Sequence, residues 1–260
     1  MGKFDSSKTR VQPVFDQLYD RDSTGRTWLP RLLRLTSCAN KVSLPLECDF
    51  TIRESRWGDR EKKLEPPVAL LSWLIRHPEM LAQREAARDP AMPPQRRELL
   101  DGSESRMMEA LELLRNNPRG ERWHVFEGET QPDVFIATPS LVVVIEGKRT
   151  EREPTTGTTW ILVRHQILRH LDCAWEIRGK RQVIGFFIVQ GEDGSEEVPS
   201  NWKEFIKNTL CEESLRASLP HRGPEEQSGI AGCFAGATTW ERVCREFSID
   251  PRALPVRANH

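Results

Sequence analysis

Residues 131–148 read QPDVFIATPSLVVVIEGK and decide the fold, because they contain two apolar runs joined by a Pro-Ser turn signal. Apolar, β-branched runs of this length are typical of buried strands. Charged side chains are rare in buried strands unless they are paired or bind a metal. Asp133 at the entrance of this hairpin, and Glu146 and Lys148 at its exit, therefore need an explanation in terms of chemistry.

The position of the turn predicts which charged residues meet. With the turn at residues 139–140, Asp133 lies opposite Glu146, and such pairs have Cβ atoms about 4.5–5.5 Å apart. Two carboxylates this close repel unless a proton or a cation lies between them. Because hard carboxylate oxygens suit magnesium or manganese, we expect a divalent cation there. Lys148 points to the same face as Glu146 and supplies positive charge for a phosphate or an attacking water.

Pro132-Asp133, followed by Glu146-Gly147-Lys148 at the end of an apolar strand, resembles the signature of the PD-(D/E)XK nuclease superfamily. The resemblance implies a metal-dependent phosphodiesterase with a restriction-endonuclease-like core. It also implies that Asp133 and Glu146 ligate Mg²⁺ or Mn²⁺, that Gly147 offers its carbonyl oxygen, and that Lys148 orients or activates water. The alternative interpretation is a hairpin whose acid and lysine form only a salt bridge at the sheet end.

The pattern around the hairpin predicts the rest of an α-β-β-β-α-β core over residues 103–190. A helix over 103–115 and a strand over 122–127 precede the hairpin. A helix over 163–177, with apolar residues at four-residue spacing, and an apolar strand over 182–190 follow it. A strand, a helix and a second strand in this order predict parallel neighbours with a right-handed crossover. The expected fold is therefore α/β with a central mixed sheet and a restriction-endonuclease-like core.

The remainder of the chain is expected to be mainly helical. We expect a helical N-terminal region over residues 1–100, packed on the core, and a nuclease-like domain over 101–260 that ends in a helical segment. The helices and the extended piece predicted outside the core fall within residues 14–19, 28–35, 42–52 (extended), 68–76, 79–89, 201–210 and 239–247, with a polar loop before the last helix.

Three further residues are candidates for contact with the substrate. Arg149 follows the lysine directly, and Gln166 and His170 lie four residues apart beside the apolar stripe of their helix. Some branches of the superfamily carry a glutamine and, four residues on, a tyrosine on this helix, so Gln166 matches and His170 departs. Many members also add an acid from the first helix of the core, for which the sequence offers three equal candidates: Glu104, Glu109 and Glu112.

Composition narrows the classes of function. The 260 residues carry a formal net charge of -1, which argues against a protein that coats nucleic acid but allows a local basic groove. No apolar run reaches the ~20 residues of a membrane span, and the charged N-terminus lacks the apolar core of a signal peptide. The 6 cysteines contain no C-x-x-C pair, which favours reduced thiols in a cytoplasm over a structural zinc site.

Together these features predict a cytoplasmic, magnesium- or manganese-dependent nuclease, with DNA favoured over RNA, in bacterial defence or DNA repair. The alternative is a catalytically silent module on the same fold that binds nucleic acid or another protein. Strandedness, cleavage specificity and oligomeric state, with a dimer among the options, stay open.

Overall fold

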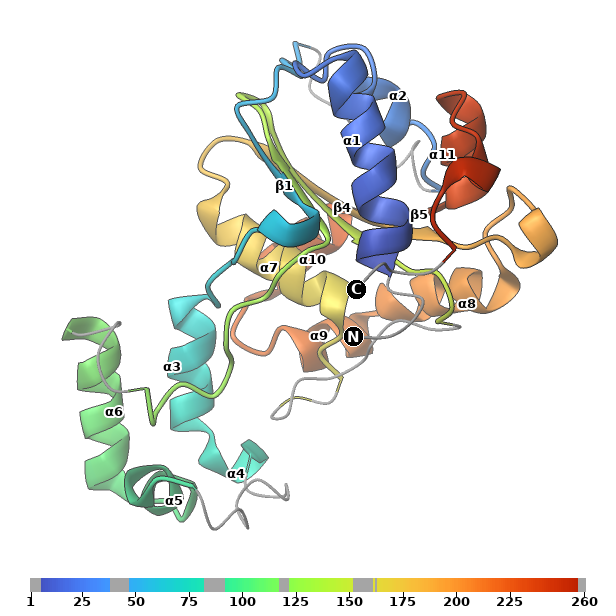
Figure 1. Cartoon of the computed structure of the whole chain (residues 1–260). Helices are drawn as coiled ribbons and strands as arrows, with labels where there is room; N and C mark the ends of the chain where they lie inside the picture. Colours follow the sequence, from blue (N-terminus) through green and yellow to red (C-terminus); the bar gives the residue numbers. More distant parts are fainter. Residues whose placement is uncertain are drawn as a thin grey trace.

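The computed structural model describes residues 6–37, 47–81, 92–116, 122–151, 161 and 163–256. Within these residues the chain forms one five-stranded mixed sheet in the order β1-β2-β3-β4-β5 (Figure 1). β1 to β3 pair antiparallel, and β3 to β5 pair parallel. The strands are β1 (Glu54–Trp57), β2 (Val134–Ala137), β3 (Leu141–Gly147), β4 (Gln182–Val189) and β5 (Phe234–Thr239). The predicted α/β class with a mixed sheet is confirmed.

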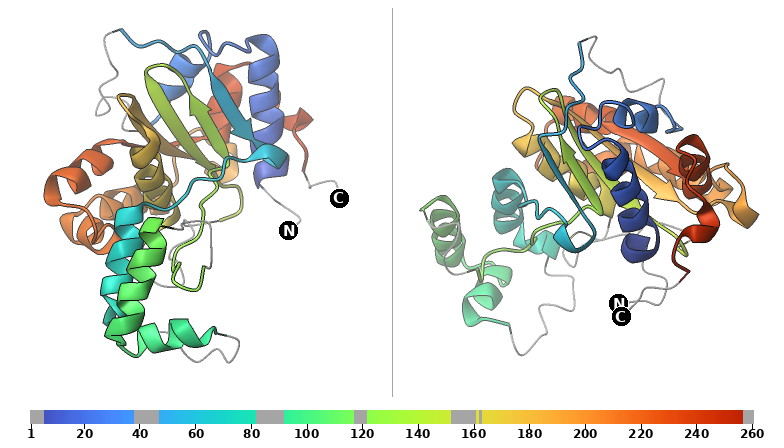
Figure 2. Two further views of the ribbon diagram at one scale, coloured as in Figure 1. Left: turned by 90° about the vertical axis from the view of Figure 1, so that its left-hand side faces the viewer. Right: turned by 45° about the horizontal axis from the view of Figure 1, so that its top comes forward.

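Helices cover both faces of this sheet, which gives three layers (Figure 2). One apolar cluster joins α1, α2 and α11 to one face, and a second joins α7 to α10 to the other. The helices are η1 (Ser7–Val11), α1 (Gln12–Arg21), α2 (Leu29–Leu33), η2 (Gly58–Arg60), α3 (Val68–Arg76), α4 (Pro78–Leu81), α5 (Pro94–Leu100), α6 (Glu104–Asn116), α7 (Gln166–Ile177), η4 (Glu192–Gly194), α8 (Ser200–Thr209), α9 (Glu212–Ser218), α10 (Pro224–Gly232), α11 (Trp240–Glu246) and η5 (Pro251–Ala253).

Burial on both faces explains why β3 is an unbroken apolar run. Val143 and Ile145 pack in the cluster under α1, while Val142 and Val144 pack in the cluster under α7. Side chains alternate between the two faces of a strand. When helices cover both faces, every position of the strand is buried, so none of them favours a polar residue.

The hairpin has the predicted register. Val134 pairs with Ile145 and Ala137 with Val142. One step inward, the Thr138 amide donates to the Leu141 carbonyl at 2.9 Å, so the turn lies at residues 139–140. The same register, continued one step outward, places Asp133 opposite Glu146.

The strand predicted over residues 122–127 is wrong, because this segment packs on helices instead of the sheet. Trp123 and Phe126 are buried in a third apolar cluster with α3, α5 and α6. The Arg96 guanidinium donates to the carbonyls of Arg122, Trp123 and Val125 at 3.1, 2.5 and 3.0 Å. In a strand these carbonyls would accept from the backbone amides of a neighbouring strand. The pattern of aromatic and charged residues was therefore that of a loop anchored on helices.

The third antiparallel strand comes from the N-terminal region. β1 pairs with β2, with Glu54 opposite Ala137 and Trp57 opposite Val134. Helices α3 to α6 are inserted between β1 and β2 and project from the sheet (Figure 1). Helices α1 and α2 pack on the sheet before these strands, so, with the insertion set aside, the order is α1-α2-β1-β2-β3-α7-β4. The helix predicted over 103–115 forms as α6, but it lies in the insertion and does not open the core. The domain boundary near residue 100 stays a prediction.

The other predicted elements vary in accuracy. Helices α1, α2, α3, α6, α8 and α11 and strand β4 form within or close to their predicted ranges, and α7 begins later, at Gln166. The polar loop predicted before the last helix is wrong, since it contains α9, α10 and β5. β5 consists mainly of small residues and has no apolar run to reveal it. Parts of the predicted segments 42–52 and 79–89 lie outside the described residues.

Phe187 tests this packing, because its fully buried ring contacts the rings of Trp202, Phe205 and Phe234. We expect Phe187→Ala to lower the free energy of unfolding by about 3–5 kcal/mol, from lost burial and the cavity left behind. Met108, 59% exposed on α6, is the control, and Met108→Ala should change it by less than about 0.5 kcal/mol. Urea unfolding followed by circular dichroism measures both; equal effects would contradict the packing.

Candidate active site

The carboxyl end of β3 brings Asp133, Glu146 and Lys148 together. Lys148 Nζ lies 2.9 Å from Glu146 Oε1, and the Gly147 amide donates to Asp133 Oδ2 at 2.8 Å. Glu146 and Lys148 are 3% and 6% exposed, whereas Asp133 is half-buried. The three residues that the sequence singled out therefore occupy one site at the sheet end, and their roles remain predictions.

Helix α7 lies against this site and supplies the two residues predicted from it. Gln166 Oε1 accepts from Lys148 Nζ at 3.0 Å. His170 Nε2 lies 3.0 Å from Glu146 Oε2, and its Nδ1 lies 2.9 Å from the Thr130 hydroxyl. His170 is fully buried and bonded through both ring nitrogens, so it is placed to hold Glu146 rather than to reach a substrate. Thr130 had no recognisable signal in the sequence.

The charges of the site shift the pKa values of its groups in opposite directions. Burial, and next the charge of Glu146, raise the pKa of Asp133 well above its ordinary value. Burial alone would raise the pKa of Glu146, but the hydrogen bond from His170 and the charge of Lys148 lower it. Burial opposes the charge on Lys148, yet Glu146 and Asp133 together raise the Lys148 pKa. Glu146 and Lys148 are thus charged, while Asp133 retains its proton more readily than an ordinary aspartate.

Gly147 is required by close packing at the strand end. A Cβ at this position would lie 2.7 Å from Val11 Cγ2 and 2.9 Å from Trp240 Cζ2. The Trp240 indole also donates to the Lys148 carbonyl at 3.0 Å. Val11 and Trp240, from opposite ends of the chain, therefore fix the backbone between Glu146 and Lys148.

The donor set fits a hard divalent cation with few protein ligands. Asp133 and Glu146 oppose each other, and after burial the charge of Glu146 is the next cause of the raised pKa of Asp133, a repulsion that a cation between the two would relieve. Glu146 already contacts Lys148 and His170, but a carboxylate has about four lone-pair sites. Among the described residues no group of three or more His, Cys, Asp or Glu side chains is arranged to hold a metal. Mg²⁺ suits such a site, because it often binds one or two carboxylates and keeps several waters.

The glutamates of α6 do not supply a third acid. Glu104, Glu109 and Glu112 lie on α6, which packs on α3 and α5 in the projecting insertion (Figure 1). Glu109 instead pairs with Arg106 at 2.6 Å. A closer acid is Glu61, after η2, whose charge contributes to the raised pKa of Asp133 and whose Oε1 accepts from Ser7 at 3.0 Å.

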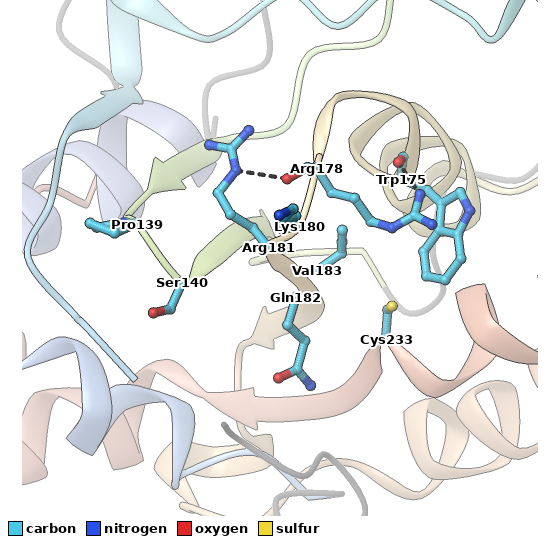
Figure 3. A pocket seen from close by; sticks show the side chains of 9 residues that line it. All are labelled: Pro139, Ser140, Trp175, Arg178, Lys180, Arg181, Gln182, Val183 and Cys233. Atoms are coloured by element: carbon cyan, nitrogen blue, oxygen red, sulfur yellow. Dashed lines mark hydrogen bonds between the residues drawn. The ribbon is translucent and has the colours of Figure 1, made fainter. Parts of the chain in front are cut away.

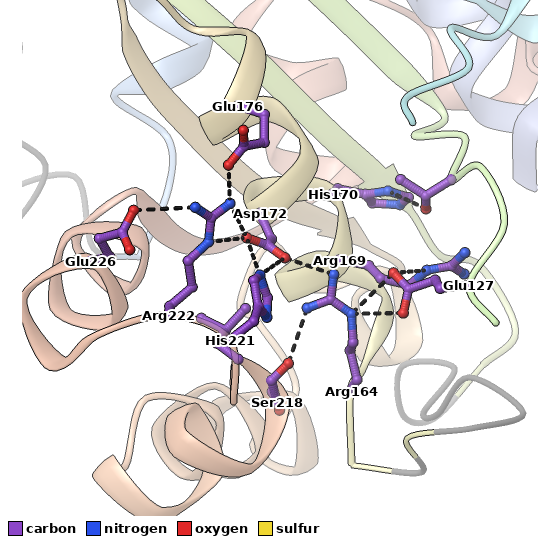
Figure 4. A network of polar contacts seen from close by, with 12 residues as sticks. Glu127, Arg164, Arg169, His170, Asp172, Glu176, Ser218, His221, Arg222 and Glu226 are labelled. Atoms are coloured by element: carbon purple, nitrogen blue, oxygen red, sulfur yellow. Dashed lines mark hydrogen bonds and ion pairs between the residues drawn. The ribbon is translucent and has the colours of Figure 1, made fainter. Parts of the chain in front are cut away.

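A buried ion network gathers around Asp172 of α7, on a different face of that helix from Gln166 and His170 (Figure 4). The fully buried Arg164 guanidinium binds Glu127 at 3.0 Å and Asp172 at 2.8 Å. Arg222 and His221 also contact Asp172. Burial alone would raise the pKa of Asp172, but the charge of Arg164 and the bonds from His221 and Arg222 hold it well below its usual range. This network anchors the segment that leads to Thr130.

The basic side chains near residues 164–181 mostly serve structure. Arg164 is buried in the ion network, and Arg169 pairs with Glu127 at 3.3 Å. Arg178, Lys180 and Arg181 line a cavity of about 440 Å³ at the hairpin-turn end of the sheet (Figure 3). Arg181 donates to the carbonyls of Ile177 and Arg178 at the end of α7, where cations favour the helix dipole. Of the predicted contacts, Arg149 remains beside the site, on the wall of a cavity of about 910 Å³.

No family model, curated protein or solved structure matches this chain. Among the described residues, no helix has the length and apolar character needed to cross a membrane. The function of this chain must therefore be inferred from the geometry of the site.

His165, next to the ion network, predicts a pH dependence of stability. Burial and the charge of Arg164 lower the pKa of His165 to about 3, against about 6.5 in an unfolded chain. Between these two pH values the unfolded state binds a proton at this histidine and the folded state does not. The contribution of His165 to the free energy of unfolding is therefore fully present above pH 6.5, and it falls by about 1.4 kcal/mol per pH unit as the pH drops toward 3. We expect His165→Phe to remove that part of the slope in urea unfolding series; an unchanged slope would contradict it.

Proposed function

We propose that this protein is a metal-dependent nuclease of the PD-(D/E)XK type that hydrolyses phosphodiester bonds in DNA. The single observation that carries the proposal is the hairpin register, in which Val134 pairs with Ile145 and the next step outward sets Asp133 opposite Glu146. The Lys148 ammonium lies 2.9 Å from Glu146 at the same strand end. The order β1-β2-β3-α7-β4, preceded by α1 and α2 and interrupted by the insertion α3 to α6, supports it. A helical segment, three strands, a helix and a strand is the order expected of a restriction-endonuclease-like core.

Asp133, Glu146 and the Gly147 carbonyl would hold the cation. A bound Mg²⁺ would polarise the phosphoryl oxygen and lower the pKa of a water molecule. The raised pKa of Lys148 keeps it charged, so it stabilises negative charge on the phosphate rather than removing a proton from water. Gln166 fixes the ammonium group, and His170 with Thr130 fixes Glu146.

The decisive test is a panel of single- and double-stranded DNA and RNA substrates, each with Mg²⁺ and with Mn²⁺. We expect the wild type to cleave DNA, and we expect Lys148→Ala to lower the cleavage rate by at least about 10²-fold. The reason is that the negative charge that develops on the phosphate loses the ammonium group that stabilises it. Lys148→Met keeps the buried stem and should lose activity equally. Lys180→Ala, at the far end of the sheet, is the matched control and should cleave like the wild type. Cleavage that survives both Lys148 substitutions would rule out the proposed site.

The second candidate is a catalytically silent module that binds nucleic acid or protein. The observation in its favour is that Lys148 and His170 contact both oxygens of Glu146, which a purely structural salt bridge would also do. Cation binding separates the two candidates, because a silent site has no need of a metal.

Isothermal titration with Mg²⁺ measures that binding. Because the proton on Asp133 must leave before the cation enters, affinity should rise with pH, and the heat should vary with the ionisation enthalpy of the buffer. Asp133→Asn should abolish the titration, whereas Asp101→Asn, on the projecting helices, should not. Absence of Mg²⁺ and Mn²⁺ binding by the wild type would select the silent module.

A further inference from the structure

Two arginines from distant parts of the sequence meet beside the candidate active site. Arg10 belongs to η1 and precedes Val11, which packs against Gly147. Arg149 follows Lys148 directly. Burial lowers the pKa of Arg10, and the charge of Arg149 lowers it further, as expected of two cations held close together. Both groups are half-buried at the end of β3.

Both guanidinium groups donate to backbone carbonyls of the C-terminal segment. Arg10 Nη1 lies 3.0 Å from the Pro255 carbonyl oxygen, and Arg149 Nη1 lies 2.7 Å from that of Val256. The buried Leu254 anchors the chain just before these two residues. The C-terminal segment 255–256 therefore covers both arginines at the edge of the site.

A neutral carbonyl oxygen is a weaker partner for a guanidinium group than a phosphate oxygen. Charge-assisted hydrogen bonds to phosphate are roughly twice as strong as neutral ones, and the arginine fork matches phosphate geometry. In the described part of the chain no carboxylate lies within ion-pair distance of Arg10, although the charge of Glu241 raises its pKa in part. A phosphate between the two guanidinium groups would relieve their repulsion, which carbonyl dipoles do only in part.

The surroundings provide room for a nucleotide next to this pair. Arg149 lines the cavity of about 910 Å³ together with Trp202 and Phe205 from α8. Glu151, Glu192 and Glu204 also line it, so a phosphate is favoured only at the end where Arg149 lies. The cavity lies where β3 and β4 end, since Thr150 and Gln190 also line it. A strand of nucleic acid that passes Lys148 on the α7 side of the sheet can therefore reach Arg149 across the strand ends.

We propose that Arg10 and Arg149 together bind a backbone phosphate adjacent to the scissile one, and that the C-terminal segment 255–256 covers them until that phosphate displaces its two carbonyl oxygens. This inference rests on the proposed nuclease function and adds a substrate-binding residue from the N-terminal helix. A purely structural role, in which the arginines only anchor the C-terminal segment, predicts the same contacts but different binding.

Fluorescence anisotropy with labelled DNA oligonucleotides, in metal-free buffer so that nothing is cleaved, separates the two roles. We expect Arg10→Gln and Arg149→Gln each to weaken binding by about tenfold, and to reduce the salt dependence by about one ion each. Arg34→Gln, exposed after α2 and distant from the site, is the matched control and should bind like the wild type. A chain that ends at Leu254 should bind more tightly than the wild type, a direction that damage to the fold would not produce.

The outcomes distinguish this inference from the proposed function. Wild-type cleavage with unchanged binding by Arg10→Gln, Arg149→Gln and the shortened chain overturns the arginine pair alone. If the two arginine variants lose thermal stability but bind DNA as well as the wild type, the arginines only anchor the C-terminal segment, and the proposal is wrong. A wild type that neither binds nor cleaves any substrate overturns both proposals. Weaker binding by the two variants and tighter binding by the shortened chain support the pair.

Discussion

The charge of Glu146 is the constraint on which the rest of the site depends. A carboxylate at the end of a buried strand is stable only if both oxygens have partners, and Lys148 and His170 provide them at 2.9 and 3.0 Å. Lys148 in turn needs Gln166, and His170 needs Thr130, so one buried charge orders residues from the end of β3, from α7 and from the loop before β2. Asp133, opposite Glu146, accepts only the Gly147 amide among the described residues, and its burial together with the charge of Glu146 raises its pKa.

The same physical rule shapes the layer beneath α7. Arg164 is fully buried and stays charged because Glu127 and Asp172 flank it, and Asp172 is shared with Arg222 and His221. Removing one member of such a network leaves an uncompensated charge in the interior, which is strongly destabilising. The network also ties the loop before β2 to α7 and to the segment after α9. The position of Thr130, and through it the orientation of His170, therefore depends on ion pairs far from the metal-ligand candidates.

The two ends of the chain converge on the strand that carries the site. Val11 and Trp240 enclose Gly147, and Arg10 contacts the C-terminal segment that also contacts Arg149. The geometry of the candidate site is thus a property of the whole chain, although its acidic and basic groups themselves lie within residues 133–148. Glu146 and Lys148 point to the opposite face of the strand, where α7 covers them, and they are almost without exposed surface.

The sequence pattern predicted the elements that depend on residues close together in the chain. The hairpin register, the parallel pairing of β3 with β4 and the body of α7 follow from side-chain alternation, turn position and helical spacing, and all three are observed. The sequence by itself therefore determined that Asp133, Glu146 and Lys148 would meet. It could not determine β1 or β5, or that residues 122–127 would form no strand, because each depends on a partner distant in sequence. Only the tertiary structure decided that α1 would cover the sheet, that the α6 glutamates would lie apart, and that Arg10 would stand beside Arg149, since those choices depend on which apolar faces find each other.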